Sequence, residues 1–203
     1  MTETRFHLLA ATAVAVLGLA TYANTLDGDW VWDDASSVLL HRHVQDPGRF
    51  FQLFAENQHA FGRGEGNFYR PLVSASFMLD YQLAGGPAPA AEGFRPPDIS
   101  TFVFHLTSVL WHVAAAVLWL LLLARLGAPR AVQFAVAAIY VVHPLHNAAV
   151  AYISGRADPM AATFVYAGLL CAIHAARRPP APAALAGVAL FGVGGLLSKE
   201  AAA

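Results

Sequence analysis

The stretch from Thr101 to Ala124 limits what this chain can fold into more than any other part of the sequence. It contains no Asp, Glu, Lys or Arg. A helix needs about 20 apolar residues to cross the hydrocarbon core of a bilayer. Charged residues make up 12% of the chain, whereas soluble domains carry about 25%. The sequence therefore predicts a membrane protein.

Four further apolar stretches are long enough, or nearly long enough, to cross a membrane. Together they predict an all-α, multipass fold with about five transmembrane helices. The expected spans are residues 6–23, 101–124, 131–149, 159–176 and 181–197. The third is interrupted by "HPLHN", where Pro144 should kink or end the helix. The fifth is short and rich in glycine, which lets helix backbones approach closely.

The two ends of the chain leave alternatives open. Arg5 precedes the first span and "TYA" loosely resembles a signal-peptide cleavage site. We favour an uncleaved helix, because the apolar run is long for a signal peptide and the later spans make the chain multipass in any case. After the fifth span the chain stops at "LLSKEAAA". We expect an incomplete protein, with a short natural chain as the alternative.

Arginines in the short loops predict the orientation. If the N-terminus is cytoplasmic, five arginines lie inside, and the short outer connections carry Arg156 and Lys199. The five are Arg5, Arg125, Arg130, Arg177 and Arg178. The long segment 24–100 then lies on the periplasmic or lumenal face. We expect a bacterial inner-membrane protein with its site on the periplasmic face.

The outer segment 24–100 holds ten of the 13 acidic residues and is too polar to span. "RFFQLF" (49–54) and "PLVSASFMLDYQL" (71–83) predict two juxtamembrane helices. We expect these helices to lie at the membrane surface with an apolar face down; the alternative, which is compatible with this, is that they pack against the other spans. "GGPAPAAEGFRPP" (85–97) predicts a loop.

The stretch "WVWDDAS" (30–36) places Asp33 and Asp34 side by side. Such a pair suits a general base, or a site for a divalent cation such as Mg²⁺ or Mn²⁺. The alternative is a solvated acidic turn. Trp30 and Trp32 favour a position at the membrane interface, because indoles concentrate there.

Two further polar features lie in apolar surroundings. Arg70, in "NFYRPL", suits a phosphate clamp, and the alternative is an anchor to lipid headgroups. His105 and His112 are seven residues apart and therefore share one helix face. Ionisable groups within a span usually face the protein interior. His105 is the better site candidate, and the alternative is that both are neutral, hydrogen-bonded histidines.

The stretch "HPLHNAAVAYISGRADP" (143–159) breaks the third span near its outer end. By residue type, His143 and His146 could join Asp158 in a metal site, although no spacing rule requires it. Arg156 and Asp158 can instead pair with each other or cap the next helix.

The polar motifs converge. Under the orientation given above, "WDD", "YRP", "HPLH", "GRAD" and "SKE" all map to one membrane face. The last of these contributes Lys199 and Glu200. Because most of these motifs are embedded in aromatic or apolar context, we interpret the convergence as a site at the outer interface. The net charge of −1 gives no indication of nucleic-acid binding.

The ordered set "YAN…WDD…NFYRPL…FHLTSVLWH…HPLHNAAVAYISGRAD…SKEAA" resembles the transmembrane and tetratricopeptide-repeat O-mannosyltransferase family and its bacterial relatives, in the GT-C superfamily. The resemblance covers residues 22–201 and implies a polyprenyl-phosphate sugar donor and a protein or glycan acceptor. It also implies further spans, often followed by helical repeats. By resemblance the matching site residues are Asp33, Asp34, Arg70, His143, Arg156, Asp158, Lys199 and Glu200.

The resemblance implies inverting glycosyl transfer, with Asp33 or Asp34 as the base. Arg70, Arg156 or Lys199 would stabilise the departing polyprenyl phosphate, or a divalent cation would do so. Two residues depart from the family pattern. Ala148 stands where glutamate is usual, and Ser108 where asparagine is common. The rival hypothesis is a non-catalytic membrane scaffold or a truncated remnant of such an enzyme, and a transporter ranks last.

Overall fold

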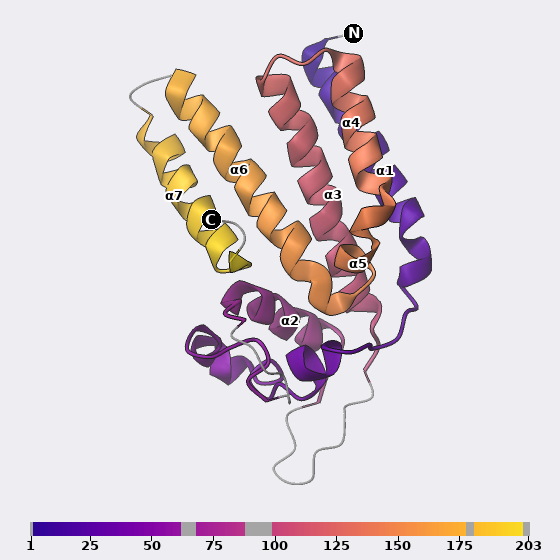
Figure 1. Ribbon diagram of the computed structural model, residues 1–203, viewed down its shortest axis with the longest axis vertical. Coiled ribbons are helices and arrows are strands. Elements are labelled where there is room, and N and C mark those ends of the chain that lie inside the picture. Colours follow the sequence, from indigo (N-terminus) through magenta and orange to yellow (C-terminus); the bar gives the residue numbers. More distant parts are fainter. Residues whose placement is uncertain (1, 62–67, 88–98, 178–180, 201–203) are drawn as a thin grey trace.

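The computed structural model describes residues 2–61, 68–87, 99–177 and 181–200, and over these residues the fold is all-helical, as predicted. Five helices run along the length of the bundle (Figure 1). They are α1 (Glu3–Thr21), α3 (Phe102–Arg125), α4 (Arg130–Val142), α6 (Ala157–Arg177) and α7 (Pro182–Leu196). The helix α2 (Pro71–Leu83) lies across the end of the bundle opposite the N-terminus (Figure 1). Most of the loop predicted over residues 85–97 falls outside the described residues.

Within the described ranges, three stretches are long and apolar enough to cross a membrane: Glu3–Thr21, Phe102–Arg125 and Ile153–Arg177. The helices α4 and α7 are apolar but have only 13 and 15 residues. At 1.5 Å per residue, α4 is about 20 Å long, which is less than the hydrocarbon thickness of about 30 Å.

The third expected span, over residues 131–149, is divided as the position of Pro144 predicts. The helix α4 ends at Val142, and the chain turns through the 3₁₀ helix η4 (Pro144–His146) into the short α5 (Asn147–Val150). The 3₁₀ helix η5 (Ile153–Arg156) then leads directly into α6. The residues between α4 and α6 therefore form a compact cap at one end of the bundle.

The helices α6 and α7 pack closely along each other, as the glycine-rich sequence of α7 predicted (Figure 1). A Cβ atom built on Gly187 would lie 2.8 Å from Sγ of Cys171 on α6. Real Cβ atoms do not approach so closely, and the absence of a side chain at Gly187 therefore sets the spacing of this pair.

The outer segment packs against the ends of the spans rather than lying apart from them. One apolar cluster joins Val38, Leu53 on the 3₁₀ helix η3 (Pro47–Phe54) and Phe77 on α2 to Phe104 and Ile153 of the bundle. All five are at most 1% exposed. Of the two alternatives for the juxtamembrane helices, packing against the spans is therefore the one that the structure shows.

A buried histidine makes the stability of this segment depend on pH. His41 is fully buried, and its Nε2 lies 3.6 Å from Oε1 of Glu56, which also accepts a bond from His43. Burial lowers the pKa of His41 to about 4. The unfolded chain, with an ordinary histidine pKa of about 6.5, therefore binds this proton more readily between pH 6.5 and 4.

We expect the free energy of unfolding to fall by up to about 3 kcal/mol as the pH drops from 6.5 to 4. Thermal unfolding in detergent across this range measures the effect. Because Glu56 and His43 lie next to His41, the diagnostic quantity is the difference from His41→Gln. His41→Gln should make the free energy of unfolding depend less on pH, whereas His174→Gln, at an exposed position, should not. Equal slopes in the wild type and His41→Gln would contradict the assignment.

Candidate functional site

A cavity of about 380 Å³ opens at the end of the bundle where α2 and the cap meet. We call it the Asp33 pocket. It is lined by Asp33, by His59 and Arg70 from the residues before α2, by residues of the cap, and by Asp158 and Lys199. Residues from Asp33 to Lys199 thus meet at one place, because the outer segment folds back onto the bundle ends.

Four of the predicted site residues line this pocket: Asp33, Arg70, Asp158 and Lys199. The structure brings these four together at one end of the bundle. The other predicted residues are Asp34, His105, His143, Arg156 and Glu200, and they do not line the pocket. Each of these five has a partner within the protein that explains its position.

Asp33 is held by a strained turn. Trp32 has a φ of 45°, in the left-handed region that bulky side chains seldom adopt. The backbone N–H of Asp33 donates to the hydroxyl oxygen of Tyr152 over 3.1 Å, and the Trp32 ring meets the Tyr152 ring edge to face. These contacts with the cap leave the Asp33 side chain exposed on the pocket wall. Burial raises the pKa of Tyr152 to about 12, so this residue remains a neutral hydroxyl.

Asp34 points into the protein instead. Its Oδ1 accepts bonds from the N–H of Ser154 at 2.8 Å and from its hydroxyl at 2.7 Å, and its Oδ2 accepts from the N–H of Val31 at 3.1 Å. Burial raises the pKa of Asp34, and these bonds oppose that shift. Asp34 therefore joins the outer segment to the cap, and Asp33 is the member of the pair that faces the pocket.

Asp33 is the member of the acidic pair that lines the pocket, because the three hydrogen bonds that Asp34 accepts hold its carboxylate against the cap. Across the described parts of the chain, no group of three His, Cys, Asp or Glu side chains could hold a metal ion. The predicted trio of His143, His146 and Asp158 is therefore not assembled. A divalent cation at Asp33 and Asp34 stays a prediction.

Two cations line the pocket in ion pairs with neighbouring acids. The guanidinium of Arg70 donates to both carboxylate oxygens of Glu200, at 3.2 and 2.9 Å. These bonds hold the pKa of Glu200 below its usual range. Lys199 pairs with Asp158. Exposed pairs of this kind contribute about 1 kcal/mol or less, so a phosphate can replace either acid at small cost.

Arg156 is fully buried, away from the pocket, and supports the fold. It forms an ion pair with Asp80 of α2 at 2.5 Å and donates to Ser108 and to the carbonyl oxygen of Phe104 on α3. The structure therefore places this arginine away from the donor-binding position that the sequence predicted. Its bond to Ser108 also gives a structural role to one of the two departures from the family pattern.

The predicted histidines likewise bond within the protein. Nε2 of His105 lies 3.2 Å from the carbonyl oxygen of Gly28, and Nε2 of His112 lies 3.2 Å from that of Val141. The Nδ1 of His143 accepts from the N–H of Leu145. For His105 and His112, the structure thus favours the alternative of hydrogen-bonded histidines.

No sequence motif marks His59, which lines the pocket together with Asp33 and Arg70. Its Nδ1 lies 2.7 Å from the hydroxyl of Ser36. Burial lowers the pKa of His59, while the charge of Asp33 opposes that shift. His59 stands in "ENQHAF", which has no recognisable motif, and only the fold brings it to the pocket.

Gly155 is required where the cap packs on itself. A Cβ atom there would lie 2.4 Å from the carbonyl oxygen of Ala148 and 3.0 Å from Cα of Ala149. Because both are backbone atoms, they cannot rotate away. We expect Gly155→Ala to lower the free energy of unfolding by about 1–3 kcal/mol, which thermal unfolding in detergent would measure.

A matched control for this substitution lies on α7. A Cβ on Gly192 meets nothing within 4 Å, and alanine favours the helical conformation over glycine. Gly192→Ala should therefore leave the unfolding midpoint unchanged or slightly higher. A Gly155→Ala protein as stable as Gly192→Ala would contradict the packing of the cap.

Similarity to known proteins agrees with this arrangement. The chain is 29% identical over 178 residues to protein O-mannosyl-transferase TMTC2 of Mus musculus, an alignment that covers 84% of this chain and 19% of the relative. It is 30% identical to Tmtc2 of Drosophila melanogaster over 92% of this chain and 19% of the relative, and 31% identical to Tmtc1 of the same organism over 78% and 18%. This chain resembles the protein O-mannosyl-transferases over most of its length.

The resemblance has a limited extent within the relatives. The chain spans about a fifth of the length of the curated relatives it matches. No protein-family model and no solved structure matches it. The departure at Ala148 falls within the site, because Ala148 lines the Asp33 pocket. The pocket therefore has a methyl group where the family pattern usually has a carboxylate.

Proposed function

We propose that this chain is the part of a membrane glycosyltransferase that activates the acceptor and binds the donor phosphate. The donor is a sugar, mannose, on a polyprenyl phosphate, and the acceptor is a hydroxyl group of a protein. The observation that carries the proposal is the meeting of Asp33, Arg70 and Lys199 in one pocket at the end of spanning helices. The names of the similar proteins support the reaction class.

The reaction forms one bond and breaks one. The acceptor oxygen bonds to the anomeric carbon of the sugar, while the bond from that carbon to the phosphate oxygen breaks and its electron pair leaves with the polyprenyl phosphate. The hydroxyl proton passes to the Asp33 carboxylate, an exposed acid of the pocket wall. Attack from the face opposite the phosphate inverts the anomeric configuration.

Arg70 and Lys199 act on the leaving group. As the bond to the anomeric carbon breaks, the phosphate gains negative charge, and a nearby guanidinium or ammonium lowers the energy of that state. Arg70 is well suited because its planar fork already makes a two-point contact with a carboxylate. When the donor binds, its phosphate oxygens would replace Glu200 as the partner of Arg70 and Asp158 as the partner of Lys199.

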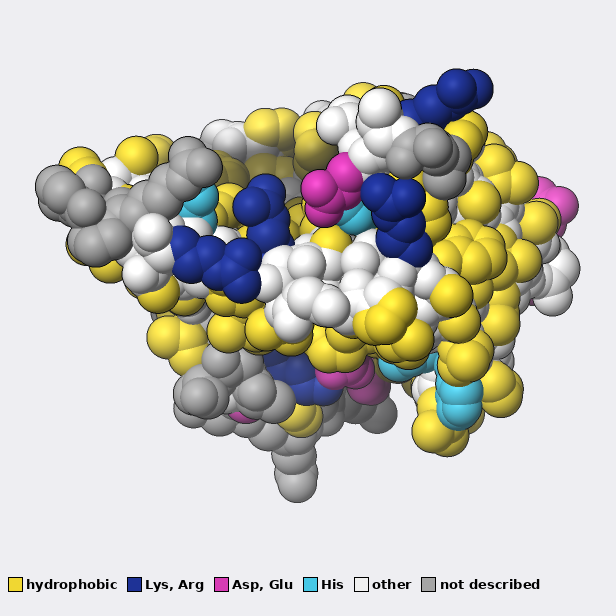
Figure 2. All heavy atoms as spheres, turned by 90° about the horizontal axis from the view of Figure 1, so that it is seen from above, with side chains coloured by type: hydrophobic (Ala, Val, Ile, Leu, Met, Phe, Trp, Pro, Cys, Tyr) yellow, Lys and Arg dark blue, Asp and Glu magenta, His cyan; other side chains and the backbone are white. Residues whose placement is uncertain are grey.

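The pocket faces the outside in this proposal, and the N-terminus is cytoplasmic. Lys and Arg side chains gather on the end of the bundle seen in Figure 2, which is the end where the N-terminus lies. Arg5, Arg125, Arg130 and Arg177 lie at the helix ends on this side. Short cytoplasmic loops carry such an excess of positive charge, which supports this orientation in a bacterial inner membrane.

The rival hypothesis is a non-catalytic scaffold, which Ala148 in the pocket wall favours. The test uses the full-length protein in liposomes, supplied with a polyprenyl-phosphate mannose labelled in the sugar and an acceptor protein. We expect label in the acceptor from this donor and none from a nucleotide sugar. Equal background transfer with and without the protein, at matched folded amounts, would support the scaffold instead.

A further inference from the structure

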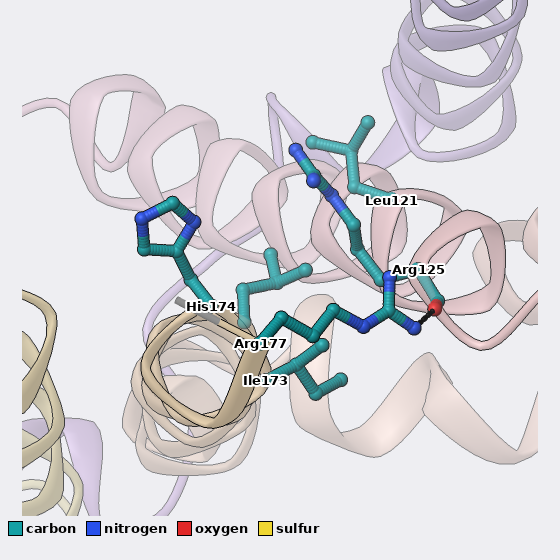
Figure 3. Close-up of a pocket in the computed structure, with 6 residues that line it drawn as sticks. Leu121, Arg125, Ile173, His174 and Arg177 are labelled. Atoms are coloured by element: carbon teal, nitrogen blue, oxygen red, sulfur yellow. Dashed lines mark hydrogen bonds between the residues drawn. The ribbon is translucent and has the colours of Figure 1, made fainter. Parts of the chain in front are cut away.

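A second cavity lies at the other end of the bundle, far from the Asp33 pocket. It has a volume of about 470 Å³ and lies between the last turns of α3 and α6. Its lining residues are Leu121, Arg125, Leu170, Ile173, His174 and Arg177, and Figure 3 shows their arrangement. We call it the basic pocket. The proposed glycosyl transfer makes no use of it.

Two guanidinium groups line the basic pocket. Arg177 reaches from α6 to α3, where its Nη2 donates to the backbone carbonyl oxygen of Arg125 at 2.5 Å (Figure 3). That bond satisfies a carbonyl at the end of α3 and holds Arg177 in place. Within the described residues, the guanidinium of Arg125 makes no hydrogen bond or ion pair, and Arg125 is exposed. Its five donors are therefore open to a ligand.

The charge of this region is unbalanced. The acid Glu3 lines an adjoining cavity of about 360 Å³ together with Arg125 and Arg177. His174 adds a further nitrogen donor or acceptor at the rim. One carboxylate beside two arginines leaves a net positive site, which favours an anionic ligand.

The walls below the charges are apolar. Leu121 of α3 and Leu170 and Ile173 of α6 line the same cavity, and both helices are long and apolar enough to cross a membrane. A ligand that fits has an anionic head at the level of the helix ends and an apolar part that continues along the helices. Membrane phospholipids have this form, and basic pockets between spanning helices bind their headgroups.

We propose that the basic pocket binds the phosphate headgroup of an anionic membrane lipid, with Arg125 and Arg177 holding the phosphate. Arginine suits this role because its planar fork contacts two phosphate oxygens at once. The lipid chains would lie against the apolar walls, which separates this ligand from free phosphate. The bound lipid would tie the diverging ends of α3 and α6 together.

The test is a titration of the delipidated full-length protein in detergent, followed by thermal unfolding. Phosphatidylglycerol should raise the unfolding midpoint and saturate. In Arg125→Gln/Arg177→Gln, the half-saturating concentration of phosphatidylglycerol should rise by about tenfold. Each arginine near a membrane surface contributes to the attraction of anionic lipid, and this variant removes two of them. Arg42→Gln/Arg49→Gln removes the same charge from two exposed arginines of the outer segment and should leave it unchanged.

Three outcomes would overturn the proposal. The first is that phosphatidylglycerol produces no saturable rise in the unfolding midpoint. The second is that Arg42→Gln/Arg49→Gln raises the half-saturating concentration as much as Arg125→Gln/Arg177→Gln does. The third is an equal rise with inorganic phosphate or with zwitterionic phosphatidylcholine, which would mean that an anionic lipid is not the preferred ligand. If the double variant is unstable, Arg125→Gln alone gives the same comparison, because this side chain makes no bond that folding requires.

Discussion

Replacing Arg156 with methionine is expected to lower the free energy of unfolding by about 3–5 kcal/mol. Arg156 and Asp80 are 0% and 1% exposed, and their ion pair at 2.5 Å joins η5 to α2. Removing the arginine leaves the Asp80 carboxylate buried without its counter-ion. Because burial already raises the pKa of Asp80 and the charge of Arg156 opposes that rise, the carboxylate should take up a proton or the helix should detach.

A double variant separates the buried charge from the packing. Arg156→Met with Asp80→Asn removes both charges, and it should recover much of the stability lost in Arg156→Met alone. Arg49→Met, at an exposed arginine that lies 3.7 Å from Asp46, should change the unfolding midpoint little. A small loss in Arg156→Met, similar to that of Arg49→Met, would contradict the structural role of the pair.

Arg156 also shows how far the sequence could predict the site. The apolar runs and Pro144 predicted the helices and the break after Val142 closely, because burial in a membrane and a missing backbone donor act locally. The motif "GRAD" was predicted to supply a phosphate-binding arginine, but Arg156 pairs with Asp80. The sequence shows no link between two residues 76 positions apart, and only the fold decides which acid meets the arginine.

Asp33 and Asp34 show the same limit of sequence-based prediction for two residues that are adjacent in the sequence. From the sequence we favour Asp33 as the base, but adjacent positions in the sequence give no physical reason to separate it from Asp34. The left-handed turn at Trp32 and the bonds from Ser154 separate them, so that one faces the pocket and the other the interior. His59 was missed because its position depends on how the outer segment packs.

The second large effect is expected from Asp33→Asn. An amide cannot take the acceptor proton, so the turnover rate for sugar transfer should fall by about 100- to 10,000-fold, the usual contribution of a general base. The fold should be little affected, because Asp33→Asn keeps the backbone N–H that donates to Tyr152 and changes an exposed side chain. Asp34→Asn should instead lower stability, because the Asp34 carboxylate accepts three buried bonds.

The most direct measurement is the rate of mannose transfer from polyprenyl phosphate by three full-length proteins at equal folded amounts. These are the wild type, Asp33→Asn and Asp29→Asn, which changes an exposed carboxylate of the same segment outside the pocket. We predict that Asp29→Asn transfers at the wild-type rate and that Asp33→Asn loses at least about 100-fold. Transfer by Asp33→Asn at the wild-type rate would contradict the assignment of the catalytic base.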